Sequence, residues 1–386
     1  MRSYTFDFET TTDPEDCRVW AYGIYSIDDD RYITDGNSIE GFIEWLECAA
    51  NCKGYFHNLG FDGVFIIDHL LKSGWLWVDS KKKATDRTFT TLISDMNQVY
   101  QITLYFTKTR YVTIQDSLKI IPLSVEAMAK AYGLEIRKGS IDYDEYREPG
   151  HEITDDERTY LVNDVAIVAK SLRTFFGQKL TKMTAGSNAL FDYKRRLGGH
   201  RKFRNVFPLL SEEEDAFIRK AYRGGFTYVN PKFQGRDVGE GIVFDVNSLY
   251  PSVMAACDGQ FLPYGKPVWF DGVPQPTERH PLWIACVLCS FKGRKEHIPC
   301  LQLKGNMMFK QTEYVEDSQG RVCITVTNVD WELMNKQYHV WDVEFIGGYM
   351  FHASPHMFQD YVCKWVDIKN QATISGNGGL RSLAKL

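Results

Sequence analysis

No stretch of this sequence approaches the roughly 18 consecutive apolar residues that a membrane-spanning helix requires. The first nine residues, MRSYTFDFE, carry Asp7 and Glu9 where a secretory signal peptide needs an apolar segment. The sequence also shows no low-complexity segment and no obvious internal repeat, which disfavours repeat architectures. We therefore expect a globular protein that has no membrane partner.

Cysteines in a regular, paired pattern are absent too. The 9 cysteines form an odd set without regular spacing, which fits reduced thiols in a cytoplasm. The one C-x-x-C, Cys286 and Cys289, lies in the apolar run LWIACVLCSF without turn glycines or a second pair. A zinc knuckle is therefore disfavoured at this position.

A strong positive charge is also missing. The net charge of −5 argues against a protein that passively coats nucleic acid. It does not exclude an enzyme acting on nucleic acid, because metal-binding carboxylates offset local basic patches. The aromatic content of 14% indicates either a large aromatic core or surfaces on which bases stack.

The length of 386 residues predicts two or three domains. Residue patterning over about the first 180 residues predicts an α/β arrangement, with alternating strands, amphipathic helices and their capping residues. We expect strands at 3–11, 19–27, 90–106 and 111–118, a short strand passing into a helix over 53–72, and helices at 38–50, 123–134 and 154–176.

The remaining sequence changes in character. Residues 178–204 contain one acid, Asp192, among many lysines and arginines, which indicates a basic linker or helix. Its charge fits a solvated surface and a phosphate-tracking patch equally well. From about 257 to 356 the pattern predicts strands and loops, and the last thirty residues predict a helix, a glycine-rich turn and the start of another helix.

Acidic residues in the first part of the chain stand at positions that suggest a common site. Asp7 and Glu9 are two apart on an expected strand and so share one face, while Phe6 and Phe8 face the opposite way. Taken alone, this pattern is more often a solvated strand face. Asp62 begins an expected helix after a strand, at the kind of sheet edge where sites collect.

Tyr160 and Asp164 are four apart on an expected helix and lie on one helix face. Such a pair alone is usually a surface or core-edge pair. The four acids together have the hard oxygen ligands that phosphodiester cleavage with two metal ions requires. A tyrosine hydroxyl can orient the water, and Lys138 is a candidate for neutralising developing charge, although most lysines are simply solvated.

A fifth acid, Asp245, ends a short apolar run that starts at Gly241, and the tight turn SLYP follows after Val246 and Asn247. We expect the run to be a strand, with Asp245 and Tyr250 brought together at its end. If this carboxylate holds a metal ion, it needs a second carboxylate as its partner.

These motifs resemble those of one enzyme family. D-x-E at 7–9, HNLGFD at 57–62 and Y-x-x-x-D at 160–164 resemble the three exonuclease motifs of family B DNA polymerases. YRGG at 222–225 resembles the Y-x-G-G motif that joins the exonuclease and polymerase domains, and DVNSLYP at 245–251 resembles the first polymerase motif. Their order and spacing are similar to the protein-primed polymerases of small tailed phages, from residue 4 to the last residue.

The resemblance implies roles in a 3′–5′ exonuclease. Asp7, Glu9, Asp62 and Asp164 would bind Mg²⁺ or Mn²⁺, Tyr160 would orient the attacking water, and Lys138 would assist. The residues implied to hold the single-stranded 3′ end are Thr10, His57, Asn58, Ser117 and Leu118. Leu123 stands where the family has an aromatic residue.

The resemblance also implies roles in polymerisation. Asp245 and the backbone carbonyl of Val246 would hold the catalytic metals, and Tyr250 would pack under the sugar of the incoming dNTP. Lys369 and Lys385 would contact the nucleotide phosphates. The residues implied to contact DNA are Tyr222, Arg223, Gly224, Gly225, Phe226 and Ser248.

The implied architecture is a ribonuclease-H-like exonuclease domain at 1–185, the first part of a palm at 186–256, an α+β insertion at 257–356 that contacts the priming protein and DNA, and the start of the fingers at 357–386. The implied partners are DNA, dNTPs and a priming terminal protein. The implied setting is a monomer in the cytoplasm of a bacterial host.

Two family motifs do not occur in these 386 residues: N-S-x-Y-G, expected after Lys385, and Y-x-D-T-D-S, which supplies the second metal-binding aspartate of the polymerase site. Because phosphoryl transfer to a 3′-hydroxyl needs carboxylates from two strands, we expect this chain to cut single-stranded 3′ ends but not to polymerise DNA. The alternatives are a catalytically inactive remnant that binds DNA or the priming protein, and one half of a split polymerase.

Overall fold

A computed structural model of the chain describes residues 1–226, 228–230, 232–246, 248–255, 261–302 and 314–385. The chain divides into two compact units, residues 1–193 with 364–386 and residues 194–363. Within the described residues, no helix has both the length and the apolar character needed to cross a membrane.

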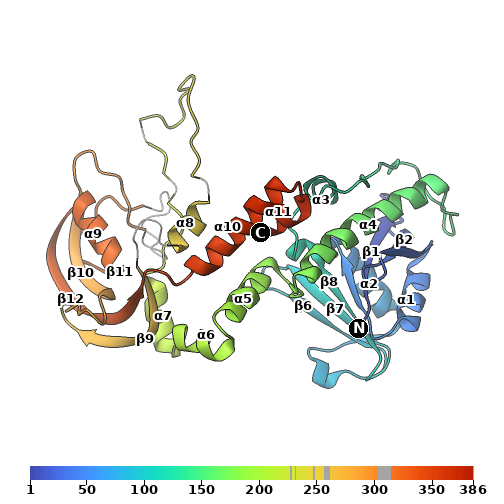
Figure 1. Cartoon of the computed structure of the whole chain (residues 1–386), viewed down its shortest axis with the longest axis horizontal. Coiled ribbons are helices and arrows are strands. Elements are labelled where there is room, and N and C mark those ends of the chain that lie inside the picture. The colour runs from blue at the N-terminus through green and yellow to red at the C-terminus, as the bar shows by residue number, and fades with distance from the viewer. Residues whose placement is uncertain (227, 231, 247, 256–260, 303–313, 386) are drawn as a thin grey trace. The chain divides into compact units, whose positions relative to one another are not determined.

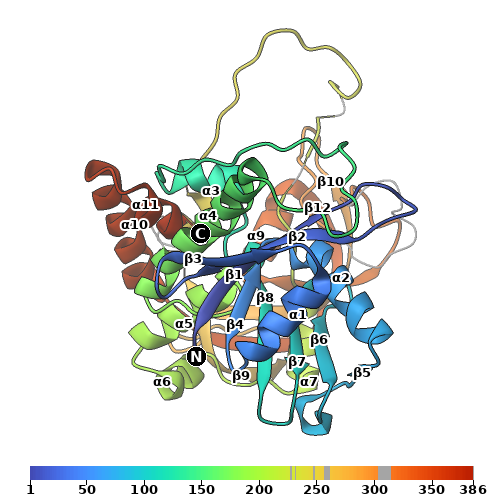
Figure 2. The same cartoon turned by 90° about the vertical axis from the view of Figure 1, so that its right-hand side faces the viewer.

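The first unit is built on a mixed sheet (Figures 1 and 2). Among the described residues the sheet has eight strands in the order β3-β2-β1-β4-β8-β7-β6-β5. The pairs β1–β4, β4–β8 and β5–β6 are parallel, and the other neighbours are antiparallel. The strands are β1 (Ser3–Thr10), β2 (Val19–Ser26), β3 (Arg31–Gly36), β4 (Lys53–Phe56), β5 (Leu76–Trp77), β6 (Thr88–Ile93), β7 (Val99–Tyr105) and β8 (Tyr111–Asp116).

Helices cover both faces of this sheet and complete an α/β unit. On one face, α1 (Ile39–Cys48) and α2 (Leu59–Lys72) bury Phe42 and Leu70 in a common core, in which Phe42 packs against the aromatic side chains of β1. On the other face, α3 (Val125–Ala131) and α4 (Asp155–Gly177) bury Met128 and Leu172. The expected α/β arrangement of this region is confirmed, although the sequence pattern missed the short strands β3 and β5.

Strand β1 alternates as its sequence predicts. Phe6 and Phe8 are 2% and 5% exposed and pack edge-on against Phe42 of α1. Asp7 and Glu9 lie on the opposite face, toward α4. The period of two in the sequence is therefore the reason that both carboxylates reach the same side of the sheet.

Gly54 of β4 allows the Phe6 ring to lie directly against the backbone. A Cβ atom at this position would lie 1.9 Å from Cε2 of Phe6, so the buried ring would have to move. We expect Gly54→Ala to lower the free energy of unfolding by about 1–3 kcal/mol, measured by urea denaturation. The matched control is Gly177→Ala at the end of α4, where no atom lies within 4 Å of the added Cβ. Equal stability of the two variants would contradict the prediction.

Helix α4 begins as its sequence predicts. The side chain of Thr154 accepts a hydrogen bond from the backbone N–H of Glu157, and the Glu157 carboxylate accepts one from the backbone N–H of Thr154. This reciprocal cap satisfies two backbone donors at the start of the helix. The cap fixes where the helix begins. Within the helix, the spacing of four residues places Tyr160 and Asp164 on one face.

The C-terminal helices of the first unit are tied to α3 and to α5 (Ala185–Arg196). In α10 (Gln359–Ile374), Lys364 Nζ and Trp365 Nε1 lie 2.8 and 3.1 Å from the buried carboxylate of Asp192. In α11 (Gly378–Lys385), Leu383 packs into the α3–α4 core. The expected helix–turn–helix at the end of the chain is confirmed. In the basic segment 178–204, residues 185–196 and 200–204 are helical and the others form turns or irregular structure.

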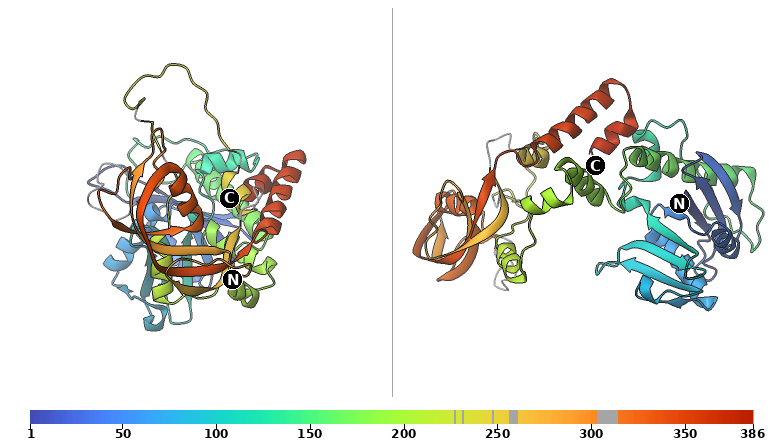
Figure 3. Two further views of the ribbon diagram at one scale, coloured as in Figure 1. Left: turned by 90° about the vertical axis from the view of Figure 1, so that its left-hand side faces the viewer. Right: turned by 60° about the horizontal axis from the view of Figure 1, so that its bottom comes forward.

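The second unit contains an antiparallel sheet of four strands in the order β11-β10-β12-β9 among the described residues (Figure 3, left). Its core includes Val287, Phe291 and Tyr338, with Met334 of the adjacent helix. The elements are α6 (His200–Val206), α7 (Glu212–Lys220), α8 (Leu249–Met254), β9 (Leu262–Asp271), β10 (Leu282–Gly293), β11 (Val322–Thr327), α9 (Asn328–Gln337) and β12 (Tyr338–Ser354). The strands expected in 257–356 are present. The proposed boundary after residue 256 lies outside the described residues.

The expectation of a strand over 241–245 is wrong for the described residues. No strand is formed there, and Ile242, Val243 and Phe244 are 81%, 96% and 88% exposed. An apolar run becomes a strand only where neighbouring strands take up its backbone N–H and C=O groups. In the described part of the chain, no strand pairs with this run.

Candidate active site

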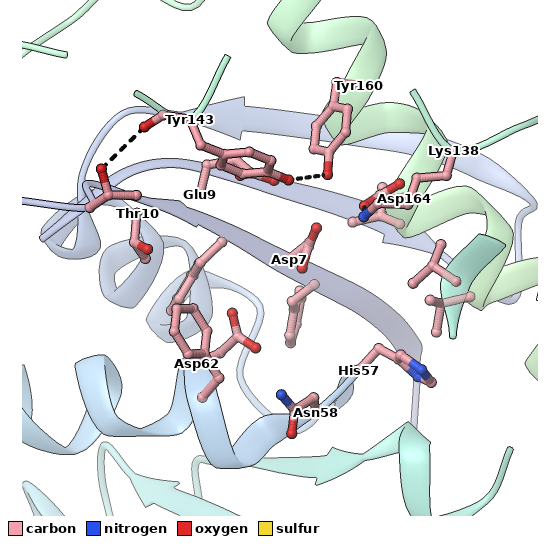
Figure 4. A pocket seen from close by; sticks show the side chains of 17 residues that line it. Asp7, Glu9, Thr10, His57, Asn58, Asp62, Lys138, Tyr143, Tyr160 and Asp164 are labelled. Atoms are coloured by element: carbon pink, nitrogen blue, oxygen red, sulfur yellow. Dashed lines mark hydrogen bonds and ion pairs between the residues drawn. The ribbon is translucent and has the colours of Figure 1, made fainter. Parts of the chain in front are cut away.

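A cavity of about 310 Å³ in the first unit brings together side chains from four parts of the chain (Figure 4). Asp7 and Glu9 come from β1, Asp62 from the first turn of α2, and Asp164 from α4; we call these four the carboxylate cluster. The cavity is also lined by Tyr160, Lys138, Tyr143, Thr10, His57 and Asn58. All six residues implied in exonuclease chemistry therefore line one cavity.

The carboxylate cluster is crowded and poorly solvated. Glu9, Asp62 and Asp164 are 6%, 4% and 3% exposed. Burial, together with repulsion from Asp164, raises the pKa of Asp7 to about 7, and burial with repulsion from Asp7 raises the pKa of Glu9 to about 9. Burial also raises the pKa of Asp62 well above its usual range. Negative charge at this site therefore needs a cation to compensate it.

Lys138 supplies one positive charge. Its Nζ lies 2.5 Å from Oδ2 of Asp164 and 5.1 Å from the centre of the Tyr160 ring. Burial lowers the pKa of Lys138, but the hydrogen bond to Asp164 outweighs this effect and the pKa is raised, so the ammonium stays charged. One lysine cannot balance four carboxylates.

The donor set of the cluster fits divalent metal ions. Mg²⁺ and Mn²⁺ prefer carboxylate oxygens, and the cluster offers them from three elements. Asp164 Oδ1 is buried and has no hydrogen-bond partner, so this oxygen remains available to bind a ligand. As the side chains stand, no three His, Cys, Asp or Glu groups in the described part of the chain are arranged around one ion position.

Tyr160 is held by a residue that the sequence reasoning did not select. The hydroxyls of Tyr160 and Tyr143 lie 2.7 Å apart, and the Tyr143 carbonyl accepts a hydrogen bond from the Thr12 hydroxyl (Figure 4). Tyr143 lies in DYDEY at 142–146, close to Lys138 in the sequence, but nothing in its spacing indicated a role. Only the folded loop brings its ring into the cavity.

The residues implied in holding a 3′ end form a connected group. Burial lowers the pKa of His57 and favours a neutral ring. Nε2 of His57 lies 2.7 Å from the Leu123 carbonyl oxygen, to which the neutral ring donates its proton, and Nδ1 lies 2.9 Å from the Ser117 hydroxyl oxygen. Thr10, His57 and Asn58 line the cavity, whereas Ser117 and Leu118 lie in the 3₁₀ turn (Ser117–Lys119) that follows β8 and support it from there.

Asp116 links these residues and was also missed by the sequence reasoning. It is 1% exposed, and its Oδ1 accepts the backbone N–H groups of Asn58 at 3.0 Å and Leu118 at 2.9 Å. Asn58 has a φ of 80°, a left-handed conformation that asparagine tolerates better than most residues. One carboxylate thus ties the end of β4 to the end of β8.

We expect Asp116→Ala to lower the free energy of unfolding by about 2–3 kcal/mol, because two backbone donors would lose a charged acceptor. Urea denaturation of the full chain measures the change. The control is Asp95→Ala on an exposed turn, which should change stability by less than about 0.5 kcal/mol. If both variants unfold at the same urea concentration, the two hydrogen bonds contribute nothing.

The residues implied in polymerisation lie in the second unit or at the C-terminal helices. Asp245 and Val246 are exposed, Ser248 precedes α8 with a φ of 56°, and Tyr250 in α8 is 73% exposed. A Cβ atom placed on Gly225 would lie 3.6 Å from the Tyr250 hydroxyl, so the YRGG segment and the DVNSLYP segment are neighbours.

The YRGG segment is anchored to the sheet of the second unit. Arg223 donates a hydrogen bond of 2.7 Å to the Thr325 carbonyl of β11. Phe226 packs edge-on against Tyr314 with ring centres 5.1 Å apart, and Tyr222 is 67% exposed. Gly224 and Arg223 both line a cavity of about 340 Å³ in this unit.

The two implied finger lysines belong to the first unit. Lys369 lies in α10 and is partly buried, and Lys385 lies at the end of α11 and is exposed. Their contact with a nucleotide remains a prediction.

Comparison with known proteins identifies the family of this chain. A family model described as DNA polymerase type B, organellar and viral, matches residues 49–149 and 144–386. The chain belongs to this family of DNA polymerases.

Among curated relatives, the chain is 42% identical over 390 residues to the DNA polymerase of Bacillus phage PZA and 41% identical to that of Bacillus phage phi29, and both alignments cover all of this chain. It is 30% identical over 382 residues to the DNA polymerase of Streptococcus phage Cp-1. The chain spans 66% of the length of the first two relatives and 64% of the third.

Solved structures show the same relationship. The orthorhombic crystal form of phi29 DNA polymerase matches with a TM-score of 0.91 and 40% identity, covering 100% of this chain and 66% of that one. The phi29 ternary complex with primer-template DNA and incoming nucleotide substrates matches with a TM-score of 0.90 and 41% identity, with the same coverage.

Proposed function

We propose that the whole protein is a protein-primed family B DNA polymerase with a 3′–5′ proofreading exonuclease, and that the first unit carries the exonuclease. The observation that carries the exonuclease proposal is the meeting of Asp7, Glu9, Asp62 and Asp164 in one cavity with Lys138 and Tyr160. A mixed sheet with helices on both faces supports a ribonuclease-H-like fold for this unit. An inactive DNA-binding remnant has no need for buried carboxylates that raise one another's pKa.

The cluster would hold two Mg²⁺ or Mn²⁺ ions, which, when bound, would activate water and stabilise the leaving oxygen of the 3′-terminal phosphodiester. The chain's own residues would then orient the reactants. Tyr160, held by Tyr143, would direct the attacking water, and Lys138 would offset the developing negative charge. Thr10, His57 and Asn58 at the cavity, supported by Ser117 and Leu118, would grip the single-stranded end.

For polymerisation we propose the roles implied by the family motifs. Asp245 and the Val246 carbonyl would bind metal, Tyr250 would pack under the dNTP sugar, and Lys369 and Lys385 would contact its phosphates. The neighbouring YRGG segment and Ser248 would contact DNA, supported by the closeness of Gly225 to Tyr250. The proposed domains are 1–185, 186–256, 257–356 and 357–386, as exonuclease, palm, insertion and fingers.

The proposed partners are primer-template DNA, dNTPs and a priming terminal protein, with the polymerase acting as a monomer in the cytoplasm of a bacterial host. The phi29 structures that match were solved with single-stranded DNA, with primer-template DNA and with nucleotide substrates. These complexes support the same classes of ligand for this chain.

The test is degradation of a 5′-labelled single-stranded oligonucleotide by the pure 386-residue chain in Mg²⁺. We expect stepwise shortening from the 3′ end, no reaction in EDTA, and no shortening by Asp7→Ala. Absence of nucleotide release by the wild-type chain, or equal release by Asp7→Ala, would overturn the exonuclease proposal.

A further inference from the structure

Lys138 and Tyr143 reach the carboxylate cluster from residues 134–153, which contain no helix or strand; we call this segment the 134–153 loop. Such a segment has no regular backbone hydrogen bonds to fix its position. The two side chains must nevertheless be placed to within a fraction of an ångström to act on a reacting phosphodiester. Some other contact must therefore hold the loop.

Arg147 is the one arginine of this loop that is almost fully buried, at 4% exposed. Within the loop, its Nη1 donates to the carbonyl oxygens of Asp142 and of Glu145, the latter at 2.6 Å. These two carbonyls flank Tyr143. The guanidinium therefore links two backbone positions of the loop next to Tyr143, whose hydroxyl contacts that of Tyr160.

The same guanidinium fastens the loop to the rest of the unit. Its Nε donates to Oε1 of Glu157 at 3.0 Å, in the first turn of α4. Its centre lies 4.8 Å from the centre of the Trp20 ring on β2, a cation–π contact. The Arg147 carbonyl in turn accepts a hydrogen bond from Arg18. Contacts to β2, α4 and the loop thus meet at one side chain.

Glu157 is fixed independently of Arg147. Its Oε2 accepts from the Thr154 backbone N–H at 3.0 Å and lies 2.8 Å from His151 Nε2. Although burial raises it, these hydrogen bonds lower the pKa of the Glu157 carboxyl to about 2. The group that receives Arg147 is therefore charged and already part of the helix cap.

A buried arginine is costly unless its donors are all satisfied, and packing alone does not need one. Methionine would fill a similar volume without holding the two carbonyls. Lysine would keep the charge, but its single ammonium cannot reproduce the planar fork. The choice of arginine is explained by the need to hold two loop carbonyls and Glu157 at once.

We propose that Arg147 is a positioning residue for the exonuclease reaction: it locks the 134–153 loop onto Glu157 and Trp20 and thereby keeps Lys138 and Tyr143 at the carboxylate cluster. This inference rests on the proposed exonuclease function. Arg147 itself does not line the cavity, so it acts through the loop and not on the DNA.

The first experiment separates rate from binding in the full chain. We expect Arg147→Met to lower kcat for nucleotide release about 100-fold, with KM for single-stranded DNA changed less than about threefold. Arg147→Lys, which keeps charge and volume, should fold and still lose at least about tenfold in kcat. The control is Arg173→Ala in α4, an exposed arginine that pairs with Asp30 at 3.2 Å; its kcat should not change. An unchanged kcat in Arg147→Lys would overturn the proposal.

The second experiment asks whether Arg147 acts through the loop. In a background that carries both Lys138→Met and Tyr143→Phe, the added effect of Arg147→Met on kcat should shrink to less than about threefold, because both groups that it positions are already gone. The same loss in both backgrounds would overturn the proposal.

Amide hydrogen exchange should also rise in the 134–153 loop of Arg147→Met but not in residues 160–172 of α4. Unchanged exchange in the loop would equally overturn it.

The exchange measurement also separates a failure of the proposed exonuclease function from a failure of the proposed role of Arg147. If the wild-type chain releases no nucleotide, the exonuclease function is wrong. The exchange comparison still decides whether Arg147 holds the loop.

Discussion

Asp7→Asn and Asp62→Asn should each slow the release of nucleotides from a single-stranded 3′ end by about 1000-fold or more. The two carboxylates come from β1 and α2 and meet at one cavity, so each offers an anionic oxygen that the other cannot replace. An amide of nearly the same shape has no charge and is a weak ligand for Mg²⁺. The loss corresponds to about 4 kcal/mol of transition-state stabilisation.

Single-turnover degradation of a labelled oligonucleotide measures this effect without interference from product release. The matched control is Asp68→Asn, which lies on the same helix as Asp62 but has an exposed carboxylate paired with Lys72. It should keep wild-type activity. Activity of Asp7→Asn within about tenfold of the wild type would show that the cluster does not carry the reaction.

The second large effect concerns stability. In the absence of metal, we expect Asp7→Asn and Glu9→Gln to raise the melting temperature at about pH 8 by several degrees, because each removes a carboxyl group that on folding must either be buried with its charge or take up a proton. The same substitutions should abolish the exonuclease. Residues that destabilise the free protein and are needed for activity are typical of a site prepared to receive a charged ligand.

The pH dependence of the protein's stability follows from the direction of the pKa shifts of Asp7 and Glu9. The folded-state pKa values of Asp7 and Glu9, about 7 and about 9, lie above the ordinary values of 3.8 and 4.5. The folded protein therefore binds more protons than the unfolded chain between about pH 4 and pH 9, and its stability falls as the pH rises through this range. The neutral variants should lose less stability over the same range.

Differential scanning fluorimetry at a series of pH values, in EDTA and in Mg²⁺, measures both effects. Mg²⁺ should raise the melting temperature of the wild type at about pH 8 and leave Asp7→Asn nearly unchanged, because only the wild type binds the ion in its folded state. Asp68→Asn should behave as the wild type does. A wild-type stability that rises between about pH 5 and pH 9 in EDTA would contradict the assignment.

Local patterns in the sequence predicted much of the first unit correctly. Strand β1 and helix α4 were expected because their residues alternate with periods of two and 3.6, and those periods do not depend on the rest of the fold. They place Asp7 beside Glu9 and Tyr160 beside Asp164. The reciprocal cap of Thr154 and Glu157 is local for the same reason.

Other predictions depended on partners that no local pattern reveals. The apolar run at 241–245 has the composition of a strand, yet it forms none in the described residues, because a strand is defined by its neighbours. Asp116 looked like any acid at a strand end, and its importance comes from Asn58, 58 residues away. Tyr143 likewise gained a role only from Tyr160.

The sequence by itself determined the family, the identity of the carboxylates and the faces on which they lie, because motif order and short-range periodicity are properties of neighbouring residues. The tertiary structure alone decided that four acids from β1, α2 and α4 share one cavity. It also decided that a loop without regular structure is held there by Arg147. The physical reason is that burial, repulsion and hydrogen bonding depend on distances in space, which chain folding sets between residues far apart in sequence.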